Sequence, residues 1–282
     1  MELLSPIPID ALDDPRVEGY ADLKDRNLRK REGLFVVEGR VNLRCLIERS
    51  PHRPLSLLVS PAAHAALADV LEMLGKEVPV YLASHEVLKG LVGFKLHRGC
   101  LALCARPDEP SLEQLVAAAP AAPAPSLLVV LEELTNHDNV GGVFRNAMAF
   151  GADAVVLCPR TCDPLYRKAI RTSMGGTLCV EFARAADWPG DALTPLRAAG
   201  YQLVALDPGG ERLESGDVPL PPRTALILGT EGAGLSDAVL EAADIRLRID
   251  MASEVDSLNV ATAAAIAMHH FFDQHADGGT PA

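Results

Sequence analysis

The chain has 282 residues, a hydrophobic content of 49%, an aromatic content of only 4% and a formal net charge of −12. This length allows two domains with a substantial core packed mainly by Leu, Val and Ala. There is no run of about 18 apolar residues, and the N-terminus lacks the basic start and apolar stretch of a secretion signal, so we expect no membrane span and, by default, a cytoplasmic protein.

The charge is unevenly distributed. Residues 1–108 hold 15 Lys and Arg against 15 Asp and Glu, whereas residues 109–282 hold 11 against 23. A basic run includes Lys24, Arg26, Arg29, Lys30 and Arg31. Such a run can bind phosphates even on an acidic protein, although on its own it is more typical of a solvated helix face with mixed charge.

Helices and strands alternate in the first domain, which we place at residues 1–108. The pattern predicts a small α/β fold that starts with a basic helix. The expected helices span residues 14–31, 39–49, 62–74 and 84–91, and the expected strands span residues 35–38, 55–60, 78–83 and 99–105. Residues 109–125 are rich in Pro and Ala and predict a semi-rigid linker with a short helix at 112–119.

The second domain, at residues 126–282, alternates in the same way. Its expected strands span residues 127–131, 154–158, 178–183, 202–206, 225–228 and 245–249. Its expected helices span residues 141–150, 165–174, 192–199, 236–242 and 258–275, with a loop at 207–223. Short connections predict a mostly parallel sheet with helices on both faces. Ligands bind such sheets at the carboxyl ends of strands, where three polar turns are expected.

The first turn carries Asn139, then glycines, then Arg145. Thr135, Asn136 and Asp138 are candidate helix caps, and the glycines would let a ligand or another backbone come close. The guanidinium of Arg145 is always charged and suits a phosphate, although for this motif alone a surface ion pair is the more frequent explanation of the arginine.

The second turn, residues 229–236, holds three glycines around Glu231. The chain lacks both the Gly-x-Gly-x-x-Gly pattern of dinucleotide-binding folds after its first strand and a Gly-Lys-Ser/Thr phosphate loop. A glutamate inside the turn disfavours a polyphosphate and suits hydroxyl or cationic groups. Taken alone, the glycines could also serve only the backbone conformation.

The third turn, Ser257-Leu258-Asn259, leads directly into an alanine-rich helix. Two short polar side chains beside the unpaired N–H groups of a helix start can hold a polar ligand.

Together the three turns resemble the SpoU/TrmH class of RNA 2′-O-ribose methyltransferases of the SPOUT superfamily. The first resembles the family's Asn-x-Gly-x-x-x-Arg motif and the second its Gly-x-Glu-x-x-Gly-Leu-Ser motif. The third, with Ile249 and Met251 before it, resembles the family's Ile-Pro-Met…Ser-Leu-Asn-Val. Residues 15–106 are similar to the family's N-terminal RNA substrate-binding domain, through residues 35–39, 59–60 and 97–99.

The resemblance implies a trefoil-knotted catalytic domain, a homodimer, S-adenosylmethionine as methyl donor and an RNA substrate, with no role for DNA, a membrane or a metal. It implies catalytic roles for Arg145, Asn139, Glu231, Ser257 and Asn259. The implied cofactor-binding residues are Gly229, Ile249, Met251 and Leu258. A dedicated N-terminal domain favours rRNA over tRNA by fold analogy alone.

Two residues depart from the family pattern, since Asp250 stands where Pro is usual and Ser253 where Gly is frequent. Both lie in the loop expected to wrap the cofactor. The basic trio Arg167, Lys168 and Arg171 is interpreted equally as an RNA contact or as a helix surface. The six cysteines are best explained as small buried hydrophobic residues.

Two rival hypotheses remain. One is an RNA-binding protein that keeps the fold without catalysis. The other is a nucleotide enzyme on a conventional doubly wound sheet, whose activity would survive deletion of residues 1–108.

Overall fold

The computed structural model describes residues 6–21, 33–92, 99–213, 221–252 and 257–276. Contacts divide the chain into two compact units, Met1–Asp108 with Pro164–Cys179, and Glu109–Asp163 with Val180–Ala282. The second unit is therefore interrupted, whereas the sequence predicts a continuous domain from 126 to 282. The reason is that α8 (Arg167–Thr172) packs against β2 (Leu34–Glu38), and α9 (Gly176–Cys179) packs against α2 (Arg40–Glu48). No helix in the described ranges could cross a bilayer.

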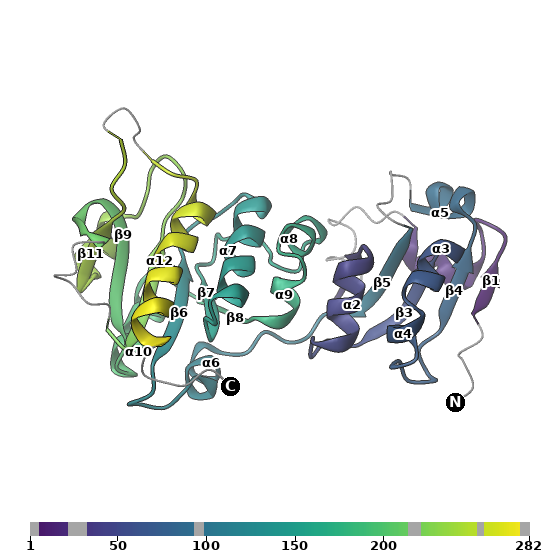
Figure 1. Cartoon of the computed structure of the whole chain (residues 1–282), viewed down its shortest axis with the longest axis horizontal. Helices are drawn as coiled ribbons and strands as arrows, with labels where there is room; N and C mark the ends of the chain where they lie inside the picture. Colours follow the sequence, from purple (N-terminus) through teal and green to yellow (C-terminus); the bar gives the residue numbers. More distant parts are fainter. Residues whose placement is uncertain (1–5, 22–32, 93–98, 214–220, 253–256, 277–282) are drawn as a thin grey trace. The chain divides into compact units, whose positions relative to one another are not determined.

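The first unit is built on a mixed five-stranded sheet in the order β1-β4-β3-β5-β2 (Figure 1). Strands β1, β4 and β3 are parallel, and β5 is antiparallel to both of its neighbours. The remaining strands are β1 (Ile7–Ile9), β3 (Pro54–Val59), β4 (Val80–Ala83) and β5 (Cys100–Ala105). The other helices are η1 (Pro15–Tyr20), α3 (Pro61–Ala66), α4 (Ala68–Leu71) and α5 (His85–Val92).

Three features of the first unit differ from the sequence prediction. The expected helix at 14–31 begins as the short 3₁₀ helix η1, with Asp14 as its cap and Pro15 in its first turn. Residues 22–32, with the basic run from Lys24 to Arg31, lie outside the described residues, as do His97 and Arg98. The helix expected at 62–74 is two short helices because Leu67 leaves helical geometry (φ −115°, ψ 7°). Strand β1 was not predicted.

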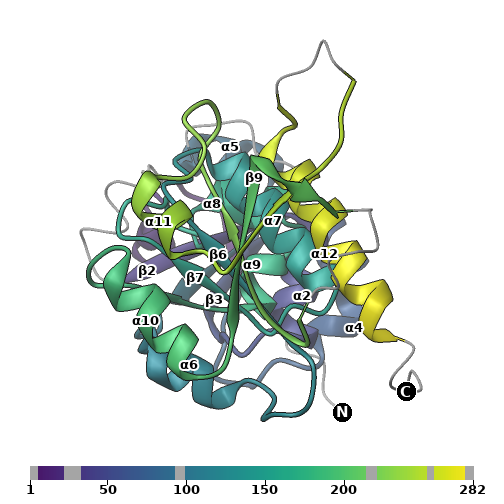
Figure 2. The same ribbon diagram turned by 90° about the vertical axis from the view of Figure 1, so that its left-hand side faces the viewer.

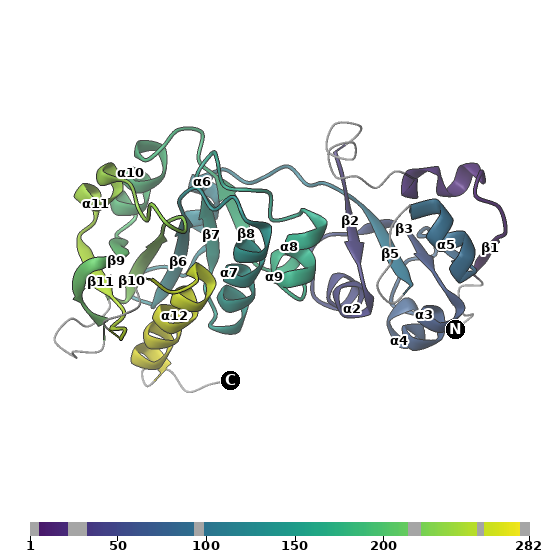
Figure 3. The same cartoon turned by 90° about the horizontal axis from the view of Figure 1, so that it is seen from above.

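The second unit contains a six-stranded sheet in the order β11-β9-β10-β6-β7-β8, and all of its pairings are parallel. Figures 2 and 3 show α7 and α12 on one face of this sheet, and α6, α10 and α11 on the other. The strands are β6 (Ser126–Leu131), β7 (Ala154–Leu157), β8 (Glu181–Arg184), β9 (Gln202–Arg212), β10 (Arg223–Leu228) and β11 (Ile245–Arg248). The helices are α6 (Leu112–Ala118), α7 (His137–Ala149), α10 (Gly190–Ala198), α11 (Asp237–Ala242) and α12 (Val260–Ala276). This arrangement confirms the predicted α/β class.

The strand order reverses between β6 and β10, which is where open parallel sheets bind ligands. β6 continues to β7 and β8 on one side, and β10 lies on the other. Leu131 and Leu228, the last residues of β6 and β10, pair in register. The chain segments that follow these two residues therefore leave the sheet side by side.

The short helix expected within the linker is confirmed as α6, which has a complete Ser111–Gln114 capping box and buries its Leu112 and Leu115 in the core. Two predicted boundaries in the second unit were wrong. The strand expected at 178–183 begins as α9, and only residues 181–184 are extended. The loop expected at 207–223 starts as a continuation of β9, which bulges where its pairing with β11 shifts register.

Candidate functional site

The first polar turn opens helix α7. Asn136 caps the helix, because its side-chain oxygen accepts a hydrogen bond from the backbone N–H of Asp138 at 2.9 Å. Asn139 lies in the first turn and is buried, with 7% of its surface exposed. Gly142 allows α12 to approach, since a Cβ at that position would lie 2.6 Å from the Cβ of Ala261.

Asn259 joins the three turns. Its side-chain Nδ2 donates to Oδ1 of Asn139 at 2.9 Å and to Oε1 of Glu231 at 2.8 Å. Its Oδ1 accepts from the backbone N–H groups of Ala261 at 3.0 Å and Thr262 at 3.3 Å, at the start of α12. Three predicted site residues, far apart in the sequence, therefore form one hydrogen-bonded junction.

The second turn folds back on itself between β10 and α11. Thr230 and Gly234 form an antiparallel bridge. A Cβ on Gly229 would lie 2.4 Å from the carbonyl carbon and oxygen of Gly234, so only glycine fits there. Gly232 and Gly234 adopt positive φ angles of 92° and 73°, which glycine tolerates without strain. The glycines thus serve the backbone and also shape a cavity.

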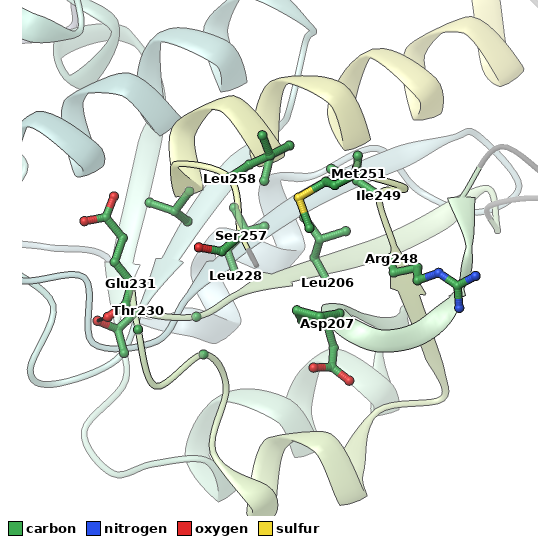
Figure 4. Close-up of a pocket in the computed structure, with 16 residues that line it drawn as sticks. Leu206, Asp207, Leu228, Thr230, Glu231, Arg248, Ile249, Met251, Ser257 and Leu258 are labelled. Atoms are coloured by element: carbon green, nitrogen blue, oxygen red, sulfur yellow. Dashed lines mark hydrogen bonds between the residues drawn. The ribbon is translucent and has the colours of Figure 1, made fainter. Parts of the chain in front are cut away.

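A cavity of about 350 Å³ lies at the carboxyl ends of β10 and β11, beside the middle of β9. Figure 4 shows Glu231 at one end and Arg248 at the other, with Leu206, Met251 and Ser257 between them. All four predicted cofactor residues line it, together with two of the predicted catalytic residues: Gly229, Ile249, Met251, Leu258, Glu231 and Ser257. Asn139, Asn259 and Arg145 are not among its lining residues.

The sequence reasoning missed one wall of this cavity, formed by Leu206, Asp207 and Pro208. These residues lie where β9 bulges, in the segment predicted to be a loop. Arg248 also lines the cavity, and its guanidinium donates to the Gly210 carbonyl and to Oδ1 of Asp250, each at 3.0 Å. Asp250, the residue that departs from the family pattern, thus anchors a wall residue. Ser253 lies outside the described residues.

Glu132 was also missed, although an acidic residue directly after a wholly apolar strand is a visible signal. It is 3% exposed. Its Oε1 accepts from Ser236 Oγ and Trp188 Nε1, both at 2.7 Å, and its Oε2 accepts from the Ser236 N–H at 2.9 Å. Trp188 is partly buried against the core and donates one of these hydrogen bonds.

Arg145 lies on α7 with its side chain exposed. Among the residues that the structure describes, it forms neither a hydrogen bond nor an ion pair. The structure therefore does not bring Arg145 into contact with the junction of Asn139, Asn259 and Glu231. Its charged guanidinium lies in solvent in the second half of the same helix, where it is available to a ligand.

The second basic cluster faces an internal carboxylate. Arg167 Nη1 and Arg171 Nη1 lie 3.7 Å and 4.0 Å from Oε2 of Glu38, whose side chain is 1% exposed. Both arginines therefore help to neutralise a buried charge in the first unit. This favours the structural interpretation of these two residues over RNA contact.

Four cysteines are buried, as expected, and form no disulfide, namely Cys45, Cys100, Cys104 and Cys158. Cys45 on α2 and Cys179 on α9 were not expected to meet, yet their Sγ atoms are 3.2 Å apart. The two thiols share a hydrogen bond, which stabilises the ionised form of Cys179 and lowers its pKa from 9.0 to about 7. The same contact, with burial, raises the pKa of Cys45.

Comparison with known proteins gives one consistent result. A protein of Mycobacterium tuberculosis named as an uncharacterized tRNA/rRNA methyltransferase is 40% identical over 264 residues, which cover 91% of this chain and 88% of that protein. The 23S rRNA (guanosine(2553)-2′-O)-methyltransferase of Bacillus subtilis is 26% identical over 269 residues, 93% of this chain and 98% of that protein.

The fold is also that of solved methyltransferases. The SpoU methyltransferase AviRb from Streptomyces viridochromogenes, solved with the cofactor AdoMet, superposes with a TM-score of 0.76 at 23% identity, over 94% of this chain and 100% of that one. The family described as SpoU rRNA Methylase matches residues 126–269, which contain all three turns and the cavity. The chain therefore belongs to the SpoU rRNA methylase family of methyltransferases.

Proposed function

We propose that this protein transfers a methyl group from S-adenosylmethionine to a ribose 2′-hydroxyl of structured RNA. The observation that carries this proposal is the cavity beside the junction of Asn139, Asn259 and Glu231. The 2′-O position is supported by the activity for which the Bacillus subtilis relative is named.

The cavity suits S-adenosylmethionine chemically. Leu206, Leu228 and Leu258 offer apolar surface for an adenine ring. Glu231 and Asp207 offer carboxylates for hydroxyl or ammonium groups, and the backbone at Gly229 and Ile249 offers further hydrogen bonds. When bound there, the donor supplies a methyl group on a positively charged sulfur.

The chain's own residues would position the acceptor and help it lose its proton. Arg145 is a poor literal base because a guanidinium keeps its proton at any ordinary pH. We infer that it clamps the phosphate next to the target and polarises the hydroxyl. Asn139 and Asn259 would hold the three turns together next to the cavity, and Glu231 would keep Asn259 in position. Ser257 would add a hydrogen bond near the ribose.

Further parts of the proposal concern substrate and assembly. The first unit would bind RNA, and we favour rRNA over tRNA, in agreement with the name of the Bacillus subtilis relative. A homodimer, a trefoil knot in the second unit and a cytoplasmic location belong to the same proposal. The proposal includes no DNA substrate, no membrane partner and no metal cofactor.

Transfer of a tritiated methyl group from S-adenosylmethionine to RNA tests the proposal directly. We expect transfer to RNA extracted from cells that lack this protein, with 2′-O-methylribose as the product after digestion. Normal donor binding without transfer to either rRNA or tRNA would instead favour the RNA-binding protein without catalysis. Mapping the new 2′-O-methyl sites would then identify the target nucleotide.

A further inference from the structure

We propose that Glu132 is a positioning residue of the methyl-donor cavity, holding both ends of the glycine turn at residues 229–236. The inference rests on the proposed function, because it assigns a role within the same site. Glu132 lies just after β6, outside the cavity lining and outside the three family motifs.

The two ends of the turn are fixed by different atoms of this one residue. At the start of the turn, the Glu132 backbone N–H donates to the carbonyl of Leu228 at 2.9 Å. At the end, its carboxylate accepts from both the N–H and the Oγ of Ser236. The distance between Leu228 and Ser236, across the turn, therefore depends on the position of Glu132.

Burial makes this clamp strong. A carboxylate that is 3% exposed needs fixed donors to replace water, and Ser236 and Trp188 supply three. Hydrogen bonds to an ionised acceptor are about twice as strong as neutral ones. The Oγ of Ser236 also caps α11 by accepting from the Val239 N–H at 3.4 Å, so the clamp, the cap and the end of the turn are one unit.

A shift of Ser236 would reach the cavity through backbone contact. A Cβ added to Gly229 would lie 2.4 Å from the Gly234 carbonyl and 2.6 Å from the Leu235 nitrogen. The backbone at Gly229 is therefore already packed against the backbone of Gly234 and Leu235. Gly229 and Gly234 both line the cavity. Movement of Ser236 would therefore change the shape of the cavity wall that these two glycines form.

Glu132→Gln is the sharpest test, because the side chain keeps its shape while one accepting oxygen becomes an amide donor. If the amide nitrogen replaces Oε2, it faces the Ser236 N–H, which is itself a donor. If it replaces Oε1, the Ser236 hydroxyl and the Trp188 indole lose their acceptor. We expect the Kd for S-adenosylmethionine, measured by calorimetry on the full chain, to rise about 10- to 100-fold. We expect kcat at saturating donor and RNA to change far less, so the substitution should act on the KM for the donor and not on the chemical step.

Two controls distinguish positioning from general weakening. Glu133→Gln changes the neighbouring carboxylate, which pairs with the exposed Arg160, and should leave the Kd within about twofold. Ser126→Ala removes hydrogen bonds to Asp153 and Tyr201 at the opposite end of β6, so it should lower the melting temperature without weakening donor binding. If Glu132→Gln does not fold, Ser236→Ala and Trp188→Phe each remove one donor to Glu132 and should raise the Kd in part.

The proposal is overturned if Glu132→Gln binds the donor as wild type does. It is equally overturned if Ser126→Ala, at a similar loss of melting temperature, weakens donor binding as much. Failure of the proposed function looks different, since wild-type protein would then either not bind S-adenosylmethionine or bind it without transferring its methyl group to RNA. Trp188, the sole tryptophan of the chain, gives an independent readout. Its fluorescence should respond to the donor in wild type and in Glu133→Gln, and the response should fall in Glu132→Gln.

Discussion

Asn259 donates a hydrogen bond from its side-chain amide to the side-chain oxygen of Asn139, which precedes it by 120 residues, at 2.9 Å. The same amide group donates to Glu231. Because both acceptors are oxygens, only a donor fits between them. The other atom of the amide, Oδ1, faces the start of α12. An asparagine therefore serves two separate functions here, and substitutions can separate them.

Asn259→Asp keeps the capping oxygen but places a carboxylate against Glu231 and Asn139. We expect methyl transfer to be lost while the helix start survives, because a carboxylate is a good helix cap. Asn259→Ala should lose both functions and destabilise the fold by about 1 kcal/mol from the lost cap alone. Thermal unfolding and tritiated-methyl transfer measure the two effects. Full activity of Asn259→Asp would contradict the role of the amide.

Gly229→Ala tests the shape of the glycine turn. Its Cβ would meet the Gly234 carbonyl at 2.4 Å, so the turn must open. We expect the Kd for S-adenosylmethionine to rise about 5- to 150-fold, since such overpacking costs about 1–3 kcal/mol. Gly190→Ala is the matched control, because nothing lies within 4 Å of its Cβ position and its φ is not positive. Equal donor affinities in both variants would refute the prediction.

Arg145→Ala should abolish methyl transfer and leave donor binding largely intact. The side chain is exposed and lines no part of the cavity, so its loss should change the free energy of unfolding by less than about 0.5 kcal/mol. We expect kcat to fall about 100-fold or more, as for other single groups that stabilise a transition state. Calorimetry with the donor provides the second measurement, and loss of donor affinity would refute this role.

Cys179 should be the most reactive described thiol near neutral pH. With a pKa of about 7 it is about half ionised at pH 7, so its alkylation rate should rise with pH and level off above that pKa. Cys45→Ala removes the hydrogen bond that lowers the pKa of Cys179 and should move the midpoint toward 9.0. Cys162, whose pKa burial raises to about 11, is the slow internal control. Mass spectrometry of iodoacetamide adducts follows each site, and a pH midpoint unmoved by Cys45→Ala would exclude the coupling.

Most of the second unit could be predicted because its strands are short, apolar and bounded by turn residues. Ser126–Leu131 is buried along its whole length, which is what an uninterrupted apolar run between polar segments predicts. The boundaries failed where tertiary contacts decide. Residues 164–179 pack with the first unit through Glu38 and Cys45, partners more than 100 residues away that no local pattern reveals.

The same distinction holds for the site. The motifs identified Asn139, Glu231 and Asn259 correctly as neighbours, because each lies at the carboxyl end of a strand in one parallel sheet. The wall from Leu206 to Pro208 depends on a bulge set by the register of β9 and β11, which periodicity does not report. The roles given to Arg145 and Ser257 stay predictions, since their partners would be ligands.

The position of Asn259 also governs when the site can exist. Synthesis adds residues at about 5–20 per second, and domains form as their last elements emerge. Asn139 and Glu231 are both made well before the residue that bridges them. A nascent chain thus carries Arg145 while the cavity still lacks the part of its lining that Val260 and Ala263 supply. On the proposed function, a fragment that ends before residue 259 would therefore not methylate RNA.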